Sequence, residues 1–189
     1  QTVEREFLTQ DELKRLEEKQ IGISRLEQVR DIFLFCCLTG LAYVDVASLS
    51  TENIVEGKRG RQWLRKARNK TNNMCNIPLL RPALRILEKY AEYRAATGRL
   101  LPVPSNQKMN AYLKELATLC GVAKNLTTHC ARHTFATTVT LANGASLENV
   151  SKMLGHSSIR MTQHYAKILN SSIERDMDKI ESELIGEDE

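Results

Sequence analysis

Apolar residues recur at helical spacing along most of this 189-residue chain. A first helix is predicted to start near Gln10, because Thr9 and Glu12 have the spacing of a capping box. A second helix, over residues 24–38, becomes apolar nearly all round in its second half, so we expect it at the buried centre of the domain. Further helices are predicted over residues 82–95, 106–120, 131–142, 147–154 and 172–184.

The region between the second and third predicted helices has a different pattern. Gly40 ends the central helix, and Asp45 helps to start a short helix after it. Strand-like stretches at residues 53–55, 62–65 and 75–79 are separated by the turn-forming segments EGKRG and NKTNN. We see no internal repeat. The predicted fold class is mainly α with a small three-stranded antiparallel β-sheet.

The length favours one domain, residues 1–189, because a single domain commonly holds about 100–200 residues. A hydrophobic share of 42% and a charged share of 26% are ordinary for a globular protein. No apolar run approaches the ~20 residues that a membrane-spanning helix needs. The apolar run at residues 32–38 is too short and too far from the start for a signal peptide. These features predict a cytoplasmic protein that does not enter a membrane.

The cysteines do not form a disulfide framework, because their number is odd and no two have CxxC spacing. We expect all five to be reduced, small core residues: Cys36, Cys37, Cys75, Cys120 and Cys130. The alternative is a zinc site without recognisable ligand spacing, made of His129, Cys75, Cys120 and Cys130.

Charge is distributed unevenly along the chain. The formal net charge is +4, but residues 171–189 hold eight acidic and two basic side chains and carry −6, which leaves +10 on the rest. A basic body with an acidic tail indicates a polyanionic partner, although a solvated surface is the plain alternative. The densest basic segment, EGKRGRQWLRKARNK, is a candidate phosphate-contacting surface. Its candidate binding residues are Lys58, Arg59, Arg61, Arg65, Lys66 and Arg68.

Two motifs in the second half of the chain carry candidate chemistry. In HCARHTFAT, His129 and Arg132 are three residues apart, which places an imidazole and a guanidinium side by side at a helix start, where both can bind one anion. In LGHSSIRMTQHYA, His156 precedes Tyr165 by nine residues across a helix, a turn and a second short helix. Taken alone, each motif has an ordinary explanation as a solvated first turn or as core packing.

Together with a basic hairpin whose turn carries Lys70, these motifs resemble the tyrosine recombinases, the integrases of phages and conjugative transposons. TGLAYVDVASL and RNKTNNMCNIPL are looser matches, and the resemblance runs from Phe7 to about Ile180. It implies the catalytic-domain fold of that family and a site-specific DNA recombinase or integrase. It also implies that the N-terminal DNA-binding domains of the parent protein are absent from this chain, and that the basic segment binds DNA.

The resemblance assigns a role to each matching residue. Tyr165 would attack a DNA phosphodiester and form a 3′-phosphotyrosyl link, which stores the energy of the broken bond, so that rejoining requires no ATP. Arg132 would hold the scissile phosphate, and Lys70 would protonate the departing 5′-oxygen. His129 would share a proton with the phenol or bind a phosphoryl oxygen, and His156 would donate to another. Because fixed cationic and N–H donors would do the work of a metal ion, no cofactor is expected.

Neighbouring residues compete for some of these roles. Lys66 is the alternative to Lys70, which is favoured because it lies in the turn before the strand that ends in IPL. His133, beside Arg132, is expected to pack or to support the site rather than to react. Asp45 is expected to brace the fold by hydrogen bonds to its neighbours.

The chain departs from the family at one position. The family's TGLR supplies a second phosphate-binding arginine, but this chain reads TGLA and has Ala42 there. Loss of such a donor typically costs roughly 2.7–4 kcal/mol of transition-state stabilisation. Our hypothesis is that Arg30, in the apolar stripe of the central helix, reaches the pocket instead, because a buried guanidinium needs an anion. In the alternative, Arg30 extends to solvent or pairs with an acid such as Asp45.

Two other functions are compatible with these motifs. A non-catalytic DNA-binding relative would explain Ala42 as decay of the site, but retention of the other motif residues argues against it. A type IB topoisomerase would use the same chemistry without pairing two sites, and its motifs are shorter and differently spaced. For a recombinase, the expected partners are double-stranded DNA and further copies of the chain, as a tetramer on DNA and a monomer when free. The last predicted helix is expected to contact a neighbouring protomer, or else to pack on its own domain.

Overall fold

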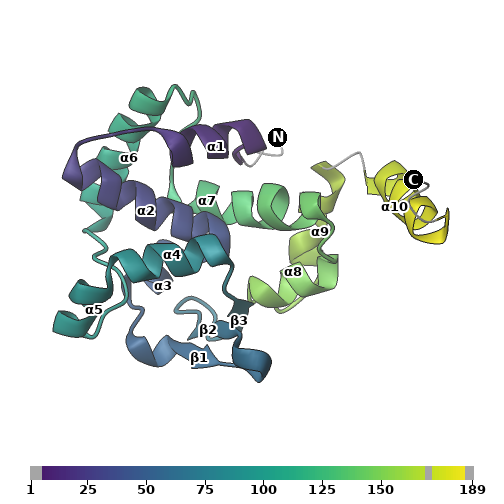
Figure 1. The fold of residues 1–189 in the computed structure, drawn as a ribbon, viewed down its shortest axis with the longest axis horizontal. Coiled ribbons are helices and arrows are strands. Elements are labelled where there is room, and N and C mark those ends of the chain that lie inside the picture. The colour runs from purple at the N-terminus through teal and green to yellow at the C-terminus, as the bar shows by residue number, and fades with distance from the viewer. Residues whose placement is uncertain (1–5, 169–171, 186–189) are drawn as a thin grey trace.

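Helix α2 (Ser24–Thr39) is the central element of the computed structural model, which describes residues 6–168 and 172–185 (Figure 1). Its second half is buried on every side, and Phe33 and Phe35 are fully enclosed. It packs against α1, α4, α6 and α7, so the core forms around it as the apolar pattern predicts. The helices of the first two thirds of the chain are α1 (Gln10–Glu18), α2, α3 (Tyr43–Ala47), α4 (Arg81–Lys89), α5 (Ala91–Thr97) and α6 (Asn106–Cys120).

The remaining helices follow in the last third of the chain: α7 (Thr128–Thr134), α8 (Leu147–Met153), α9 (Arg160–Ile168) and α10 (Ser172–Ile185). Figure 1 shows α7 alongside α2, α8 and α9 next to each other with α8 nearest to β3, and α10 apart from them. Within the two described ranges, none of the helices has both the length and the apolar character that a membrane crossing requires.

The predicted antiparallel sheet is confirmed. Its strands are β1 (Ile54–Glu56), β2 (Gln62–Ala67) and β3 (Met74–Pro78), in the order β1-β2-β3. Leu64 pairs with Ile54 on one side and with Ile77 on the other. Because Leu64 and Ile77 are buried, this face of the sheet packs on the helices. With the sheet in this position, the loop from β2 to β3 lies between α3 and α8.

The helix predicted over residues 131–142 differs in the structure. Helix α7 begins earlier, at Thr128, because the Thr127 hydroxyl caps it by accepting a hydrogen bond from the backbone N–H of Cys130. After Thr134 the helix widens into a π-helical segment, residues 135–140, which ends in a tight turn. The Thr140 hydroxyl donates to the carbonyl of Phe135, so this carbonyl in the widened turn accepts a hydrogen bond from a side chain.

The helix predicted over residues 82–95 is also interrupted. The backbone leaves helical geometry at Tyr90, between α4 and α5. The Tyr90 hydroxyl and the Lys89 ammonium both donate to Oδ2 of Asp31 on α2, at 2.6 and 2.7 Å. This tertiary anchor holds the chain where local propensity alone would continue the helix.

All five cysteines are buried and free of disulfide bonds, as predicted. Burial raises the pKa of the Cys36 thiol to about 12 and that of Cys130 to about 11. Both therefore stay protonated and unreactive at neutral pH.

The glycine that ends α2 generates a stability prediction. Gly40 and Gly98 both have left-handed backbone conformations, with φ of +75° and +74°. An added Cβ at Gly40 would lie 2.5 Å from Cδ1 of Phe135, whereas at Gly98 it would meet nothing within 4 Å. We expect Gly40→Ala to lower the free energy of unfolding about 1–3 kcal/mol more than Gly98→Ala, the cost of overpacking a core. Urea denaturation measures the free energy of unfolding of both variants, and equal losses of stability would contradict the packing at Gly40.

The capping box of α1 generates a prediction about pH. Burial raises the pKa of Glu12. Two hydrogen bonds, from Lys124 and from the Thr9 backbone, lower it, and so does the positive charge of Lys124. These effects outweigh burial, so the pKa of Glu12 lies below the usual 4.5. A lowered folded-state pKa stabilises the fold above the unfolded value, and this contribution is lost as pH falls through the folded value. Glu12→Gln should therefore cost about 1 kcal/mol at pH 7 and progressively less below pH 4.5. Unfolding free energies at several pH values test this, with the exposed Glu18→Gln as control; a loss at Glu12 that is independent of pH would contradict it.

Candidate active site

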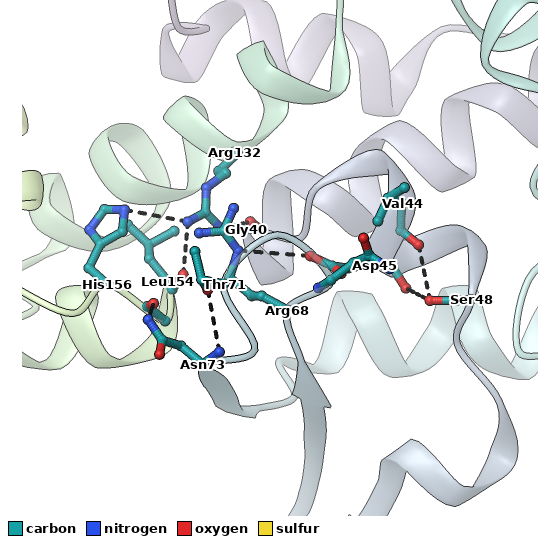
Figure 2. Close-up of polar contacts among 12 residues, drawn as sticks. Gly40, Val44, Asp45, Ser48, Arg68, Thr71, Asn73, Arg132, Leu154 and His156 are labelled. Carbon is teal, nitrogen blue, oxygen red and sulfur yellow. Dashed lines mark hydrogen bonds and ion pairs between the residues drawn. The ribbon is translucent and has the colours of Figure 1, made fainter.

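Arg132 lies where three segments of the chain meet. Its side chain is buried, with Nη1 donating to the carbonyl of Gly40 at 2.7 Å and Nη2 donating to the carbonyl of Leu154 at 2.8 Å (Figure 2). Gly40 follows α2, and Leu154 follows α8. Because a buried guanidinium is costly unless its donors are satisfied, these two carbonyls hold it in place and tie the segments together.

The imidazole of His156 stands next to this guanidinium. Nε2 of His156 lies 3.4 Å from Nη2 of Arg132 (Figure 2). On the other side of the ring, Nδ1 lies 2.6 Å from the hydroxyl of Thr162. Since arginine can only donate, this contact favours the tautomer in which Nε2 accepts and Nδ1 carries the proton toward Thr162. Thr162, which sequence reasoning did not single out, thus orients His156 from the first turn of α9.

Tyr165 is almost fully enclosed, with 2% of its surface exposed. Its hydroxyl is in hydrogen-bond contact with Nδ1 of His133, and its ring packs against that of His164 with centroids 3.9 Å apart. His133, which was expected to pack or to support the site rather than to react, therefore contacts the phenol directly. The spacing of HCARHTFAT alone could not indicate this, because Tyr165 comes from α9, thirty-two residues further on.

Arg68 follows β2 and lies on the opposite side of Arg132 from His156 (Figure 2). Its side chain is only 10% exposed, and its Nε lies 3.9 Å from Oδ2 of Asp45. Oδ1 of Asp45 accepts a hydrogen bond of 2.9 Å from the backbone N–H of Asn69. Asp45 therefore braces the β2–β3 loop against α3, which agrees with the structural role predicted for it.

The positive charge of Arg68 is close enough to act on the guanidinium of Arg132. The pKa of Arg132 is lowered to about 10, first because the group is buried and next because of the positive charge of Arg68. Cys75, Tyr165 and Asp45 act in the opposite direction, which places the Tyr165 side chain within electrostatic range of the same guanidinium. Arg132 stays charged at neutral pH, and a bound anion would restore its pKa.

The other two residues assigned by the resemblance are less enclosed. Lys70 is exposed in the β2–β3 turn, and its competitor Lys66 is half-buried on β2. His129 is exposed in the first turn of α7, while Arg132 in the same helix is buried. The structure therefore sets the His156 imidazole beside Arg132, has Tyr165 within electrostatic range of the same guanidinium, and leaves His129 and Lys70 open to solvent.

Arg30 is not part of this pocket, and the hypothesis that it replaces the missing arginine is wrong for this structure. Its Nη1 donates to the carbonyl of Lys19, just after α1. Gly40 lies ten residues further along the chain, or about 15 Å along a helix axis at 1.5 Å per residue. Arg30 lines a hollow with Glu17 and Arg85 on another face of α2.

The basic segment divides into surface and buried residues. Lys58, Arg59, Arg61 and Arg65 are exposed on the β1–β2 loop and β2. Arg68, which was expected with them on the surface, instead has its side chain mostly enclosed beside Asp45. The sequence pattern could not separate the two cases, because the register of the hairpin turns Arg68 inward.

Among the described residues, no three His, Cys, Asp or Glu side chains are arranged to hold a metal ion. The alternative zinc set is dispersed, since His129 is exposed whereas Cys75, Cys120 and Cys130 are separately buried.

The chain is similar to recombinases in sequence. Residues 6–171 match the phage integrase family. The chain is 32% identical over 146 residues to tyrosine recombinase XerD of Rhizobium meliloti, which is 71% of this chain and 45% of that protein. The chain spans only 24–60% of the length of that protein and of two other curated tyrosine recombinases that it matches.

Solved structures share the fold. XerH recombinase bound to its difH substrate superimposes with a TM-score of 0.68 and 16% identity, over 84% of this chain and 50% of that one. The catalytic domain of bacteriophage HP1 integrase superimposes with a TM-score of 0.64 and 20% identity, over 93% of this chain and 95% of that one. These likenesses show the fold that the sequence motifs predict. With the family match over most of its length, the chain belongs to the phage integrase family and has the fold of a tyrosine recombinase catalytic domain.

Proposed function

We propose that this chain is the catalytic domain of a site-specific DNA recombinase or integrase that cleaves and rejoins double-stranded DNA without metal or ATP. The observation that carries the proposal is the gathering of Tyr165, His156 and the buried Arg132 from three separate segments. Such a set can place a nucleophile, a hydrogen-bond donor and a fixed positive charge around one phosphate.

In the cleavage step, the oxygen of Tyr165 attacks the scissile phosphorus. A bond from that oxygen to phosphorus forms, and the bond from phosphorus to the 5′-oxygen breaks. Negative charge on the non-bridging oxygens is stabilised by Arg132, whose position is set by carbonyls before the DNA arrives. His156 donates to one of these oxygens once its Nε2 carries a proton. Rejoining runs the same steps in reverse, with a 5′-hydroxyl as the nucleophile.

Proton transfer involves residues at the margin of the pocket. His133, which contacts the Tyr165 hydroxyl, is placed to receive the phenolic proton as attack begins. Lys70 is exposed on the turn that approaches the pocket and supplies a proton to the departing 5′-oxygen. His129 is exposed at the helix start, where it binds a phosphoryl oxygen. Exposure suits both residues, because DNA would cover them on binding.

DNA approaches from the side of the sheet that carries the exposed basic residues. Lys58, Arg59, Arg61 and Arg65 contact phosphates there, which gives affinity that falls steeply with salt and carries little sequence information.

Assembly of copies on DNA involves α10. Its apolar residues Ile173, Met177, Ile180 and Leu184 follow the 4-3-4 spacing of one helix face and are each at least 47% exposed. An apolar helix face that its own domain leaves open suits docking on a neighbouring protomer. We propose that α10 links protomers in a tetramer on DNA.

The nucleophile is tested by covalent trapping on nicked duplexes whose sequence is randomised around the nick. The wild-type chain should form a protein–DNA adduct that resists denaturation, in EDTA and without ATP. Tyr165→Phe should abolish the adduct, because only the hydroxyl is lost, and Tyr112→Phe on α6 is the matched control. An adduct that survives Tyr165→Phe, or that needs a divalent metal, would sink the mechanism. A wild type that binds DNA without forming any adduct would favour the non-catalytic relative.

The role of α10 is tested by placing a charge on its apolar face. Ile180→Glu should reduce complexes of more than one protomer on DNA, because a desolvated carboxylate opposes apolar docking, and it should leave the unfolding midpoint unchanged. Ser182→Glu adds the same charge outside that face and is the control. Size-exclusion chromatography with light scattering measures the complexes. If both variants assemble like the wild type, α10 does not join protomers.

A further inference from the structure

The missing arginine leaves a gap at a defined place. Ala42 is two residues from Gly40, whose carbonyl holds Arg132, and it caps the start of α3. An arginine at position 42 would start from the same loop that supports Arg132. With alanine there, the loop presents no positive charge to a phosphate beside Arg132.

A different segment of the chain supplies a guanidinium next to Arg132. Arg68 enters from the end of β2, and its stem packs against Gly155 of the LGH motif, where an added Cβ would lie 3.0 Å from Cδ of Arg68. The β2–β3 loop is held in this position by Asn69 on Asp45 and by Asn73, whose side-chain amide donates to the carbonyl of Gly155 at 3.0 Å. Arg68 is therefore fixed between α3 and the motif that carries His156 (Figure 2).

The charges around Arg68 do not balance. Two guanidinium groups, of Arg68 and Arg132, share one enclosed region with the carboxylate of Asp45, which stands 3.9 Å from Nε of Arg68 and is the one carboxylate among the described residues found to act on Arg132. One oxygen of Asp45 is already engaged by the backbone of Asn69. Among the described residues, Nε of Arg68 is the one buried side-chain nitrogen or oxygen without a hydrogen-bond partner. Buried charges and buried N–H donors are normally satisfied, so this arrangement is one acceptor and one negative charge short.

We propose that Arg68 is the second phosphate-binding arginine of the active site, and that together with Arg132 it holds the scissile phosphate in place of an arginine at position 42. This rests on the proposed function and deepens it. A phosphodiester supplies what the pocket lacks: a negative charge and oxygen acceptors that two guanidinium forks can engage. Asp45 orients Arg68, and the phosphate oxygens accept hydrogen bonds from the guanidinium N–H groups that Asp45 does not bind.

The closing experiment compares arginine variants on a phosphate and on a neutral analogue. The substrate is the duplex recovered as the covalent adduct of the wild-type chain from the randomised pool. A second version carries a methylphosphonate at the cleaved position, where a methyl group replaces one charged oxygen. Arg68→Ala should form adduct roughly 10²–10³-fold more slowly on the phosphate, as expected for loss of one transition-state donor. Its defect should be much smaller on the methylphosphonate, because that substrate has no charge for Arg68 to neutralise.

Three further variants exclude a purely structural role. Arg68→Lys keeps the charge without the fork and should fall between Arg68→Ala and wild type. Ala42→Arg combined with Arg68→Ala should recover cleavage, because it restores a guanidinium from the neighbouring loop. Arg85→Ala, which removes an exposed guanidinium from α4, should match the wild type on both substrates. If Arg68→Ala cleaves at the wild-type rate, or is equally impaired on both substrates and not recovered by Ala42→Arg, the proposal is overturned.

Binding of inorganic phosphate tests Arg68 independently of any DNA cleavage. Phosphate should raise the unfolding temperature of the wild type and of Arg85→Ala, because a ligand that binds only the folded state stabilises it. This increase should be lost in Arg68→Ala even after allowance for that variant's own unfolding temperature. A wild type that forms no adduct but shows this Arg68-dependent increase would contradict the recombinase function and still support Arg68 as a phosphate ligand. An increase that is unchanged in Arg68→Ala would overturn the assignment of Arg68.

Discussion

The structure of the site depends on one buried guanidinium and the two backbone carbonyls that hold it. Arg132 joins the carbonyl of Gly40, after α2, to that of Leu154, after α8. Backbone carbonyls cannot change their chemistry by mutation, so the position of Arg132 follows from the path of the chain itself. The packing of Gly40 against Phe135 belongs to the same arrangement, because it sets how closely the α2 end approaches α7. Loss of this contact would disperse the residues that the proposed chemistry needs.

The charges of the same region fit the anion binding proposed for it. Placing Arg68 beside Arg132 in an enclosed space raises the electrostatic free energy of the folded chain, and Asp45 offsets only part of it. Such strain is common where binding must be strong, since the ligand then relieves it. It also gives a physical reason for a chain of this family to tolerate Ala42, because a guanidinium that comes from the hairpin can occupy the place of one that comes from the loop.

The proposed nucleophile and the proposed assembly element are close along the chain. Tyr165 lies on α9, and α10 begins seven residues later. Tyr165 is enclosed and contacts His133, whereas the apolar face of α10 is open. A contact made by α10 with another protomer would therefore lie only a few residues along the chain from the proposed nucleophile, which suggests a route by which assembly on DNA could influence cleavage.

Much of this protein could be predicted from its sequence, because local signals govern it. The all-round apolar second half of α2, the capping box at Thr9 and the turn-separated strands correctly predicted the central helix, the start of α1 and the sheet. The spacing of HCARHTFAT and LGHSSIRMTQHYA was enough to indicate the family. Only the tertiary structure decided which arginine joins Arg132: Arg30 and Arg68 are both basic residues near apolar ones, but one bonds the end of α1 and the other enters the pocket. The surroundings of a long side chain are set by segments distant in sequence, and the periodicity of its own segment does not encode them.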